Sequence, residues 1–309
     1  MHAGAIARVR TARVTILLGW LAFACLALSW HARADQVWIA LSSREPAYLE
    51  AASALRANLP DDEVRIGEWG EFNFRAGAPH LLVTVGTEAF RQLREASETT
   101  RLIAILTPRS TMDELRGTTA GRISGVYFEQ SFARQARLLH AAFPDKPRVG
   151  MVLGPSTVRY RNEIAQALRG EGMEGVFEVI QDKAELPEAV QRVLSGADVF
   201  LALPDAEAIS NQTAKFILLA TYRRGLPLVG YSSAFVKAGA AVAMVSSPTQ
   251  IGKEAARMAR DVLAGRRLPP PRPASEYDVL VNSNVSRSLG LGLDETQLEA
   301  RLRDEGDRR

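Results

Sequence analysis

Small hydroxylated side chains follow the apolar runs of this chain, at the points where strands are expected to end. Ser42 and Ser43 follow the run from Val37 to Leu41, and Thr87 follows the run from His80 to Val85. A helix is expected to begin at each place, so a hydroxyl and the free backbone N–H groups beside it could hold a carboxylate or another anion. The competing role is an ordinary N-cap, in which the hydroxyl satisfies the helix itself.

The same arrangement recurs in the second half of the chain. Ser156 and Thr157 follow the run from Val149 to Leu153, and Asp205 follows the run from Val199 to Leu203. Hydroxyls from two halves of the molecule could clamp one ligand. The carboxylate of Asp205 is the best candidate for a contact with a ligand ammonium, and capping of the next helix is its alternative role.

Two tyrosines stand at positions where a ring could stack on an apolar or aromatic ligand. Tyr231 and the neighbouring Ser232 end the strand after Asp205, and Tyr127 lies near an expected passage between two lobes. Aromatic residues make up only 7% of the chain, so a ring at a strand end is less expected by chance. Tyr231 could instead seal an interface between lobes.

The motifs of common enzyme classes are missing. After residue 34 the only histidines are His80 and His140, and neither has neighbours at metal-ligand spacing. There is no G-x-S-x-G elbow, no P-loop, and no G-x-G-x-x-G after the first strand. We therefore expect no metal, cofactor or catalytic residue; an exported enzyme would need a buried acid/base pair, for instance Glu45 with Asp205.

The elements that must position these side chains alternate regularly between apolar runs and helical patterns. The runs are short and continuous, as is typical of strands covered on both faces. The helical patterns span 47–59, 131–143, 159–168, 186–194, 208–223 and 252–263. This alternation predicts an α/β fold with parallel sheets, in which ligand groups gather at the carboxyl ends of the strands.

Two series of strands of similar length predict two Rossmann-like lobes joined by crossings. We expect lobe 1 to comprise residues 35–126 and 247–275, and lobe 2 to comprise 127–246 and 276–292. The proline-rich segment 266–273 reads as a stiff extended connection. The charged segment 293–309 is predicted to be a solvated helix or a frayed end rather than a partner site.

The first 34 residues are typical of a secretory signal. Three arginines precede an apolar run from Val14 to Leu28, and Ala32-Arg33-Ala34 forms an A-x-A exit. We expect cleavage after Ala34 and a periplasmic location, with a membrane anchor as the competing interpretation. Lipidation at Cys25, the only cysteine, is disfavoured because the apolar run continues beyond it.

Charge and cysteine content change once that segment is set aside. The net charge of +3 comes from four arginines in it; without them 34 basic side chains face 35 acidic ones, so nucleic acid is not an expected partner. The remaining chain has no cysteine for disulfides, and its 275 residues are enough to build their own cores.

Several short segments occur in an order that resembles a known family. They are Gly86 to Ala89, Ile123 to Val126, Arg148 to Val152, Leu203 to Asp205, Val236 to Ala240, Gly252 to Ala256, Val281 to Asn282 and Ser288 to Leu291. Together with the export signal they resemble the ABC-transporter substrate-binding family whose better-known members bind aromatic amino acids, within the type 1 periplasmic binding-protein fold. Glu88 stands where proline is common in that family, and Thr107-Pro108-Arg109 lacks an acidic residue that many members have there.

The resemblance implies hinge crossings, a ligand enclosed when two lobes close, and neither catalysis nor a cofactor. It implies ligand contacts at Thr87 and Thr107, and an approach to a second crossing at Val236 to Ala240. We expect capture of a small organic ligand, an amino acid or related compound, for an ABC permease. The alternative is a periplasmic accessory protein that partners a membrane sensor or an outer-membrane receptor. A repressor with this fold would need a helix-turn-helix before the first strand, where a signal stands instead.

Overall fold

The structure is a computed structural model that describes residues 37–59, 64–75, 78–98, 100–117, 121–210 and 212–307. The predicted signal, residues 1–34, and Cys25 within it lie outside the described residues. None of the helices in the described part is both long enough and apolar enough to cross a bilayer.

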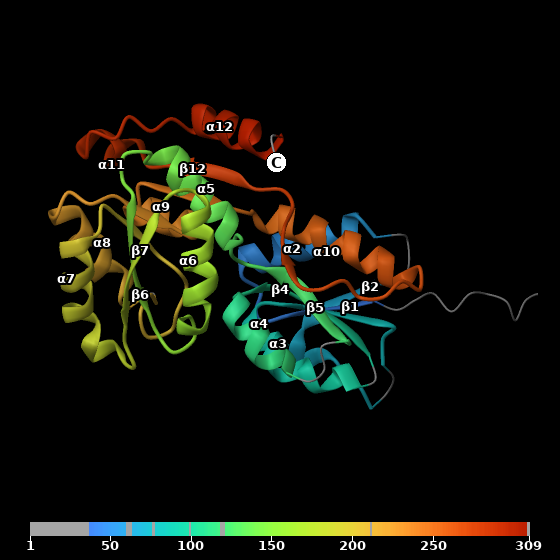
Figure 1. Ribbon diagram of the computed structural model, residues 1–309. Helices are drawn as coiled ribbons and strands as arrows, with labels where there is room; N and C mark the ends of the chain where they lie inside the picture. The colour runs from blue at the N-terminus through green and yellow to red at the C-terminus, as the bar shows by residue number, and fades with distance from the viewer. Residues whose placement is uncertain are drawn as a thin grey trace, which may run out of the picture.

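Two lobes, each built around a six-stranded sheet, make up the described part of the chain (Figure 1). The strands of the lobe 1 sheet, in spatial order, are β11 (Arg272–Pro273), β5 (Ile123–Tyr127), β4 (Arg101–Thr107), β3 (Leu81–Val85), β1 (Val37–Leu41) and β2 (Val64–Glu68). Those of lobe 2 are β12 (Asp278–Val281), β10 (Val242–Val245), β9 (Leu228–Gly230), β8 (Val199–Leu201), β6 (Arg148–Leu153) and β7 (Glu174–Val179). The predicted two-lobed α/β architecture is confirmed.

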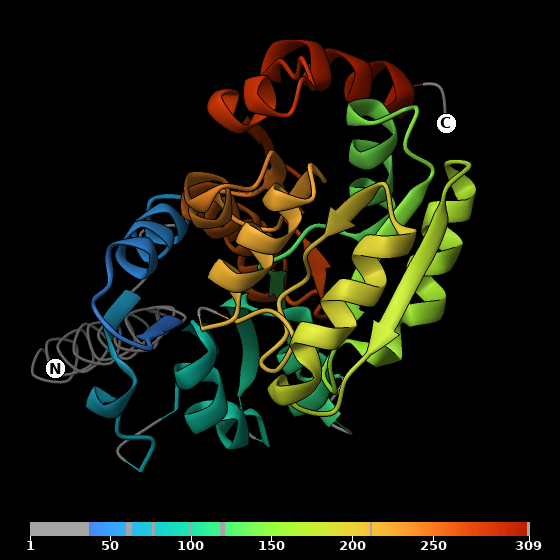
Figure 2. The same ribbon diagram turned by 90° about the vertical axis from the view of Figure 1, so that its left-hand side faces the viewer.

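Helices cover both faces of each sheet (Figure 2). Lobe 1 carries α2 (Pro46–Ala57), α3 (Thr87–Leu93), α4 (Arg109–Arg116) and α10 (Pro248–Leu263), with short 3₁₀ turns η1 (Trp69–Glu71) and η2 (Arg94–Glu98). Lobe 2 carries α5 (Phe132–Ala142), α6 (Arg161–Gly170), α7 (Leu186–Gly196), α8 (Ala214–Arg223), α9 (Ser233–Ala238), α11 (Ser283–Ser288), α12 (Glu295–Asp307), η4 (Val158–Tyr160) and η5 (Lys183–Glu185).

The central strands have continuous apolar sequences because both of their faces are covered. Every residue of β1 and β3 is buried, and both strands pair in parallel with their neighbours. One face packs on α2 and α10, where Gly252 is required: a Cβ there would lie 2.3 Å from the carbonyl oxygen of Ala51. These two rigid sheets hold the loops at their carboxyl ends in place.

Three strand features differ from the expectation or were missed by it. β2 is an edge strand in which only Gly67 is buried, so no apolar run marked it. β11 lies inside the proline-rich connection and pairs in parallel with β5. β12 runs antiparallel to β10, so the sheet of lobe 2 is not purely parallel.

The C-terminal segment differs from the predicted solvated helix or frayed end. Leu298 and Leu302 on α12 are 2% and 3% exposed and belong to the core beside α5. Arg301 donates a hydrogen bond to the carbonyl oxygen of Ala141 at 3.0 Å. The prediction missed this contact because the apolar stripe of α12 consists of only two leucines among mostly polar residues. The helix lies across the top of lobe 2 (Figure 1).

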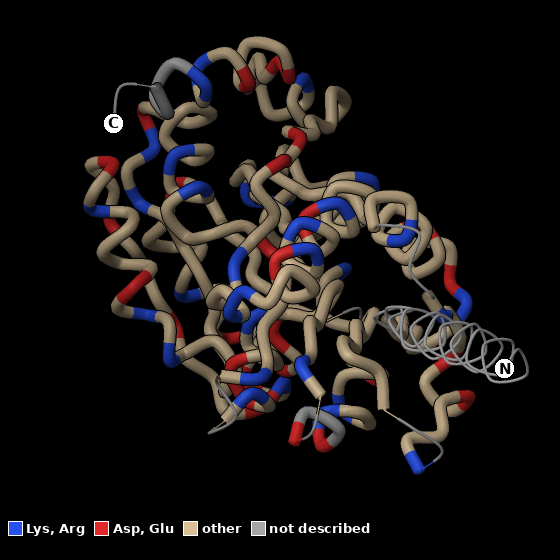
Figure 3. The backbone as a smooth tube through the Cα atoms, turned by 90° about the vertical axis from the view of Figure 1, so that its right-hand side faces the viewer, with Lys and Arg blue, Asp and Glu red and all other residues tan. Residues whose placement is uncertain are grey.

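Charged residues of both signs are interspersed along the backbone of the two lobes (Figure 3). Several form ion pairs, such as Arg148 with Asp198 at 2.7 Å and Arg192 with Glu178 at 2.8 Å. These pairs lie within a lobe and are partly exposed, so each contributes little to stability.

Three chain segments cross between the lobes and are tied directly to one another. Residues 128–131 connect β5 to α5, residues 246–247 connect β10 to α10, and residues 274–277 connect β11 to β12. Gln130 Nε2 donates to Ser246 Oγ at 2.7 Å, and Ser246 Oγ donates to the carbonyl oxygen of Glu276 at 2.7 Å. All three crossings therefore meet at Ser246.

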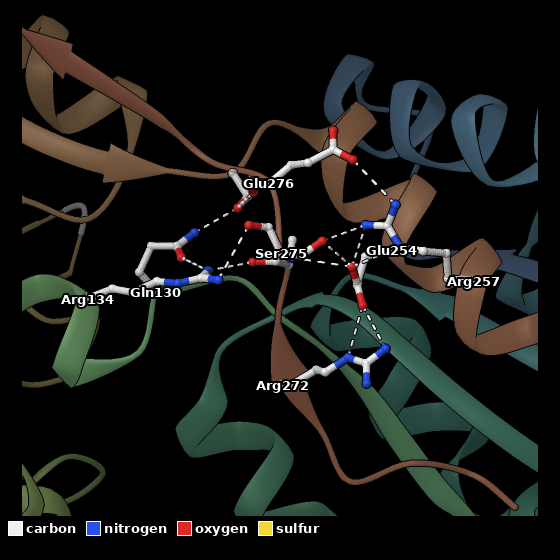
Figure 4. A network of polar contacts seen from close by, with 9 residues as sticks. Gln130, Arg134, Glu254, Arg257, Arg272, Ser275 and Glu276 are labelled. Carbon is white, nitrogen blue, oxygen red and sulfur yellow. Dashed lines mark hydrogen bonds and ion pairs between the residues drawn. The ribbon is translucent and has the colours of Figure 1, made fainter. Parts of the chain in front are cut away.

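A buried carboxylate anchors the third crossing to lobe 1 (Figure 4). Glu254 on α10 is 2% exposed and accepts hydrogen bonds from Arg257, Arg272 and Ser275 at 2.5–2.9 Å. Burial alone would raise the pKa of Glu254, but these donors lower it to about 2. From the other side, Arg134 donates to the carbonyl oxygen of Ala274 at 2.6 Å.

Candidate ligand cleft between the lobes

A cleft of about 1340 Å³ lies between the two lobes, where the strands of both sheets end. Both sheets have the same strand order, and in each the order reverses next to the first strand, β1 or β6. In such sheets, ligands bind outside the carboxyl ends of the strands at this point. The cleft is lined by residues of both lobes and of the crossings, among them Leu106 and Pro108 from lobe 1, Pro204, Leu218, Tyr231 and Asp278 from lobe 2, and Phe128 and Ser246 at the crossings.

Tyr231 and Ser232, both predicted to contact a ligand, line this cleft. The ring of Tyr231 packs against Phe128 of the first crossing at 6.1 Å and against Phe235 at 5.0 Å, measured between centroids. Burial and the nearby Glu129 carboxylate raise the pKa of Tyr231 to about 12. Ser232 also caps α9, because its Oγ accepts the N–H of Phe235 at 3.2 Å. Their contact with a ligand stays a prediction.

A smaller cavity of about 40 Å³ adjoins the cleft, and Pro204 lines both. Its walls include the predicted residues Tyr127 and Thr157, together with Phe132 and Tyr160. Glu129, on the first crossing, also lines it. This cavity is largely aromatic, and it brings Tyr127 of lobe 1 next to two rings of lobe 2.

Asp205 is engaged within lobe 2 rather than free for a ligand. Its Oδ2 accepts from Ser156 Oγ at 2.7 Å and from both the N–H and the hydroxyl of Thr157 at 3.1 and 2.8 Å. Its Oδ1 accepts the N–H groups of Glu207 and Ala208. Burial opposes ionisation, but these hydrogen bonds outweigh it and lower the pKa of Asp205. The geometry favours the capping alternative for Asp205 and joins Ser156 and Thr157 to the same structural role.

The predicted hydroxyls of lobe 1 lie in different situations. Ser42 Oγ accepts the N–H of Ala89 at 2.9 Å and so caps α3. Thr87, the first residue of α3, is partly exposed, whereas Thr107 is fully buried and donates to the carbonyl oxygen of Ile105. Ser43 Oγ is buried and has no hydrogen-bond partner among the described residues. Ser43 is therefore the predicted lobe 1 hydroxyl with unused bonding capacity in the described part of the chain, and the hydroxyl of Thr84 on β3 is likewise buried and unpaired there.

Thr107 is turned inward by an irregularity of its strand. The register of β4 against β5 shifts between Ile105 and Thr107, and Leu106 between them has a φ of 51°. A bulge of this kind redirects side chains. It places Leu106 on the wall of the cleft and Thr107 in the interior, so the hydroxyl expected from the resemblance cannot reach a ligand in this conformation.

Arg109 connects the two lobes beside the small cavity. Its guanidinium donates to both carboxylate oxygens of Glu163 on α6, at 2.9 and 2.8 Å. The same guanidinium stacks on Tyr160 of lobe 2 at 4.6 Å from the ring centroid. Tyr160 in turn donates its hydroxyl to Asp113 Oδ2 on α4 at 2.6 Å. These contacts form an interlobe latch, by which we mean Arg109, Asp113, Tyr160 and Glu163.

Among the described residues that line the small cavity, Glu129 is the one with an acidic side chain. Its Oε2 accepts the backbone N–H of Arg109 at 3.0 Å. Burial raises the pKa of Glu129 to about 7, against the opposing effect of that hydrogen bond and of the Arg109 cation. Among the described residues, no group of His, Cys, Asp and Glu side chains could hold a metal ion.

Comparison with known proteins agrees with this geometry. A family model described as ABC transporter substrate binding protein matches residues 73–301, which is most of the chain. The chain belongs to the ABC transporter substrate-binding protein family. No curated protein matches the chain.

Solved structures share the fold of this family member at low sequence identity. A Streptococcus pneumonia ABC domain in complex with L-Trp is 17% identical, with a TM-score of 0.59, over 86% of this chain and 97% of that one. A ligand-free, open substrate-binding protein with adhesive properties from Clostridium difficile is 17% identical, with a TM-score of 0.62, over 84% and 96%. A periplasmic ribose ABC transporter protein from Conexibacter woesei is 19% identical, with a TM-score of 0.53, over 87% and 98%.

Several residues of the site were not predicted from the sequence. Phe128, Glu129 and Phe132 lie on or next to the first crossing, and Tyr160 lies in a turn after β6. The position of the first crossing was expected from the sequence. The signal that could have identified Phe128 and Glu129 is an aromatic residue followed by a carboxylate at that crossing. Arg109 was noticed only as a departure from the family pattern, and its partner Glu163 is 54 residues away.

Proposed function

We propose that this protein is an exported solute-binding protein that encloses a small organic ligand between its lobes and delivers it to an ABC permease. The observation that carries the proposal is the cleft of about 1340 Å³ between two sheets, with three chain crossings that meet at Ser246 and can act as a hinge. A ligand in this cleft contacts both lobes. Because an open form lacks half of those contacts, the ligand stabilises the closed form.

The lining of the cleft supports an organic ligand with an apolar part. Phe128, Tyr231, Phe235 and Leu218 supply rings and branched aliphatic groups, and polar groups are fewer. The relative from Streptococcus pneumonia is described in complex with L-Trp, a ligand that combines an aromatic ring with charged groups. An amino acid or a related compound is therefore the ligand class that we propose.

We propose that the ligand is released unchanged. The acid/base pair that an enzyme on this fold would need, Glu45 with Asp205, has no support in the geometry: five hydrogen bonds hold the Asp205 carboxylate, and its pKa is lowered rather than raised. A general acid in the cleft would need the opposite shift. Family membership favours an ABC permease as the partner over a sensor or an outer-membrane receptor.

Native mass spectrometry of the chain from residue 35 onward tests the proposal directly. The protein is purified without denaturation, and the small molecules that it carries are identified. We expect one bound organic molecule per chain, and we expect its re-addition at about a hundredfold excess over Kd to stabilise the stripped protein by about 2.7 kcal/mol. If nothing co-purifies and no compound in a broad set of amino acids, amides, nucleosides and sugars raises the Tm, the proposal is wrong.

A further inference from the structure

Glu129 is a partly buried carboxylate that forms no ion pair with the side chains in the described part of the chain. The one hydrogen bond that its side chain accepts from another described residue comes from the backbone N–H of Arg109. The guanidinium of Arg109 is committed elsewhere, to Glu163 at 2.8 Å and Asp113 at 3.5 Å. Partial removal of a carboxylate from water without an ion pair is unfavourable, so a proton or a cation from outside stabilises this site.

The walls around Glu129 already demonstrate that they attract a cation. The guanidinium carbon of Arg109 lies 4.6, 5.1 and 5.7 Å from the ring centroids of Tyr160, Phe132 and Tyr127. The electron-rich faces of such rings stabilise positive charge, most effectively where water is excluded. Arg109 also lines the cavity, but its charge is paired with Glu163 and Asp113, so the aromatic rings and the Glu129 carboxylate still have the chemistry of a site for a second cationic nitrogen.

The space beside Glu129 suits a head group rather than a whole ligand. The small cavity measures about 40 Å³, which is room for a few water molecules, since one water needs roughly 10–15 Å³ on this measure. The adjoining cleft, with a volume of about 1340 Å³, has room for the rest of the ligand. Phe128, directly before Glu129, and Tyr231, on which the Glu129 charge acts, form a wall of that cleft.

We propose that the ligand carries a cationic nitrogen, which Glu129 holds in the small cavity, and an apolar, ring-sized body that lies against Phe128 and Tyr231. The inference rests on the proposed function and names its ligand chemistry: a protonated amine or a related cation. Among the described residues that line the cleft, Glu45 and Asp278 are acidic and Lys215 is basic, so the charge of the wall favours an approaching cation.

Three probes of nearly equal shape test the charge requirement: 2-phenylethylamine as the cation, 2-phenylethanol as the neutral analogue and 3-phenylpropanoate as the anion. Binding to the stripped wild-type protein is measured by calorimetry at about pH 8, where Glu129 is ionised and the amine is still protonated. We expect the amine to bind at least roughly tenfold more tightly than either analogue, the ratio expected for a charge-assisted hydrogen bond.

Glu129→Gln removes the negative charge of the side chain and keeps its shape. The amide oxygen can still accept the N–H of Arg109, so the crossing is preserved, and the Tm of the variant verifies this. We expect the variant to bind 2-phenylethylamine at least roughly tenfold more weakly and 2-phenylethanol unchanged. Glu174→Gln, which removes an exposed carboxylate on edge strand β7 away from the cleft lining, is the matched control and should change amine affinity less than about twofold.

The results that would contradict the cation site can be distinguished from those that would contradict the proposed function. If the alcohol binds as tightly as the amine, or if Glu129→Gln leaves amine affinity unchanged, the cation site is wrong while ligand binding in the cleft stands. A co-purified molecule without a basic nitrogen overturns the inference in the same way. If the amine does not bind, no molecule co-purifies and no compound stabilises the protein, both the inference and the proposed function fail.

Discussion

At the scale of single residues, the two carboxylates beside the cleft have opposite environments. Asp205 receives five hydrogen bonds, which lower its pKa, whereas Glu129 receives one from another residue and has a pKa of about 7. Strand-end position alone suggested Asp205 as the ammonium contact. Because hydrogen-bond donors of the protein surround Asp205 but only one from another residue reaches Glu129, we propose Glu129 as the ammonium contact instead.

Asp205→Asn should lower stability without changing ligand affinity. An amide nitrogen cannot accept the bonds from Ser156 and Thr157, so buried donors lose their partner, at a cost of roughly 1–3 kcal/mol in the free energy of unfolding. Urea denaturation measures the loss, and calorimetry with the co-purified molecule measures affinity. A variant of normal stability that binds more weakly would restore Asp205 as a ligand contact.

Glu129 should make the protein less stable as pH rises from about 4.5 to about 7. The folded-state pKa lies above the ordinary value of 4.5, so the native state holds the proton more tightly than the unfolded state does. The stabilising contribution is complete below about pH 4.5 and is lost as pH rises through 7, with a total of roughly 1–3 kcal/mol. Urea denaturation across this range, with Glu129→Gln as the control, should show the decline only in the wild type; equal curves would contradict the burial of this carboxylate.

At the scale of elements, helices α4 and α6 are joined by the interlobe latch while the crossings act as the hinge. The latch and the hinge lie on different segments of the chain, and each joins the lobes. Because lobe separation breaks the latch but leaves the crossings intact, the latch contributes to the closed form alone. Its strength therefore adjusts the population of closed protein before any ligand arrives.

Glu163→Gln should shift the ligand-free protein toward an open form. The substitution removes the charge that Arg109 grips with two hydrogen bonds, and because Glu163 is half-exposed the loss is modest, about 1 kcal/mol or roughly a fivefold change in the open-to-closed ratio. Small-angle scattering should report a larger radius of gyration. Since residues 35–309 have no cysteine, two introduced labels can also measure the lobe separation.

Glu178→Gln provides the matched control for the latch. It removes the pair with Arg192, which has similar exposure but lies within lobe 2. We expect no change in lobe separation from this variant. If both variants open the protein equally, or if neither does, the ion pair of the latch does not hold the lobes together.

At the scale of the whole molecule, two similar sheets and their crossings make one ligand-sized cleft. ABC transporter substrate-binding proteins typically act outside the cytoplasm. The basic, apolar and A-x-A pattern of residues 1–34 predicts that this chain is exported.

The exported protein should begin at Asp35. Mass spectrometry of the intact chain from the periplasmic fraction should give the mass of residues 35–309 without a lipid, because Cys25 is removed with the signal. Changing Ala34 to a bulky residue such as Leu should block processing and leave the chain in the membrane fraction. If the exported chain instead begins at a lipidated Cys25, the prediction is wrong and the protein is a membrane-anchored lipoprotein.

Most of the architecture could be predicted from the sequence because it depends on local patterns. Strands covered on both faces, such as β1 and β3, require continuous apolar runs, and helices against them require apolar stripes. Edge strand β2 and the two-residue β11 escaped because exposed or very short strands carry no such pattern. The apolar stripe of α12 was concealed by its many charged residues.

The sequence by itself determined the α/β order, the two strand series and the polar strand ends that point to a cleft. Only the tertiary structure decided which polar groups remain available there, because bonding capacity depends on partners far along the chain. Asp205 is occupied by Ser156, 49 residues away, and Arg109 by Glu163, 54 residues away. Glu129 is left with one bond to a neighbouring segment. Strand-end position is local, but hydrogen-bond saturation and burial are properties of the folded chain.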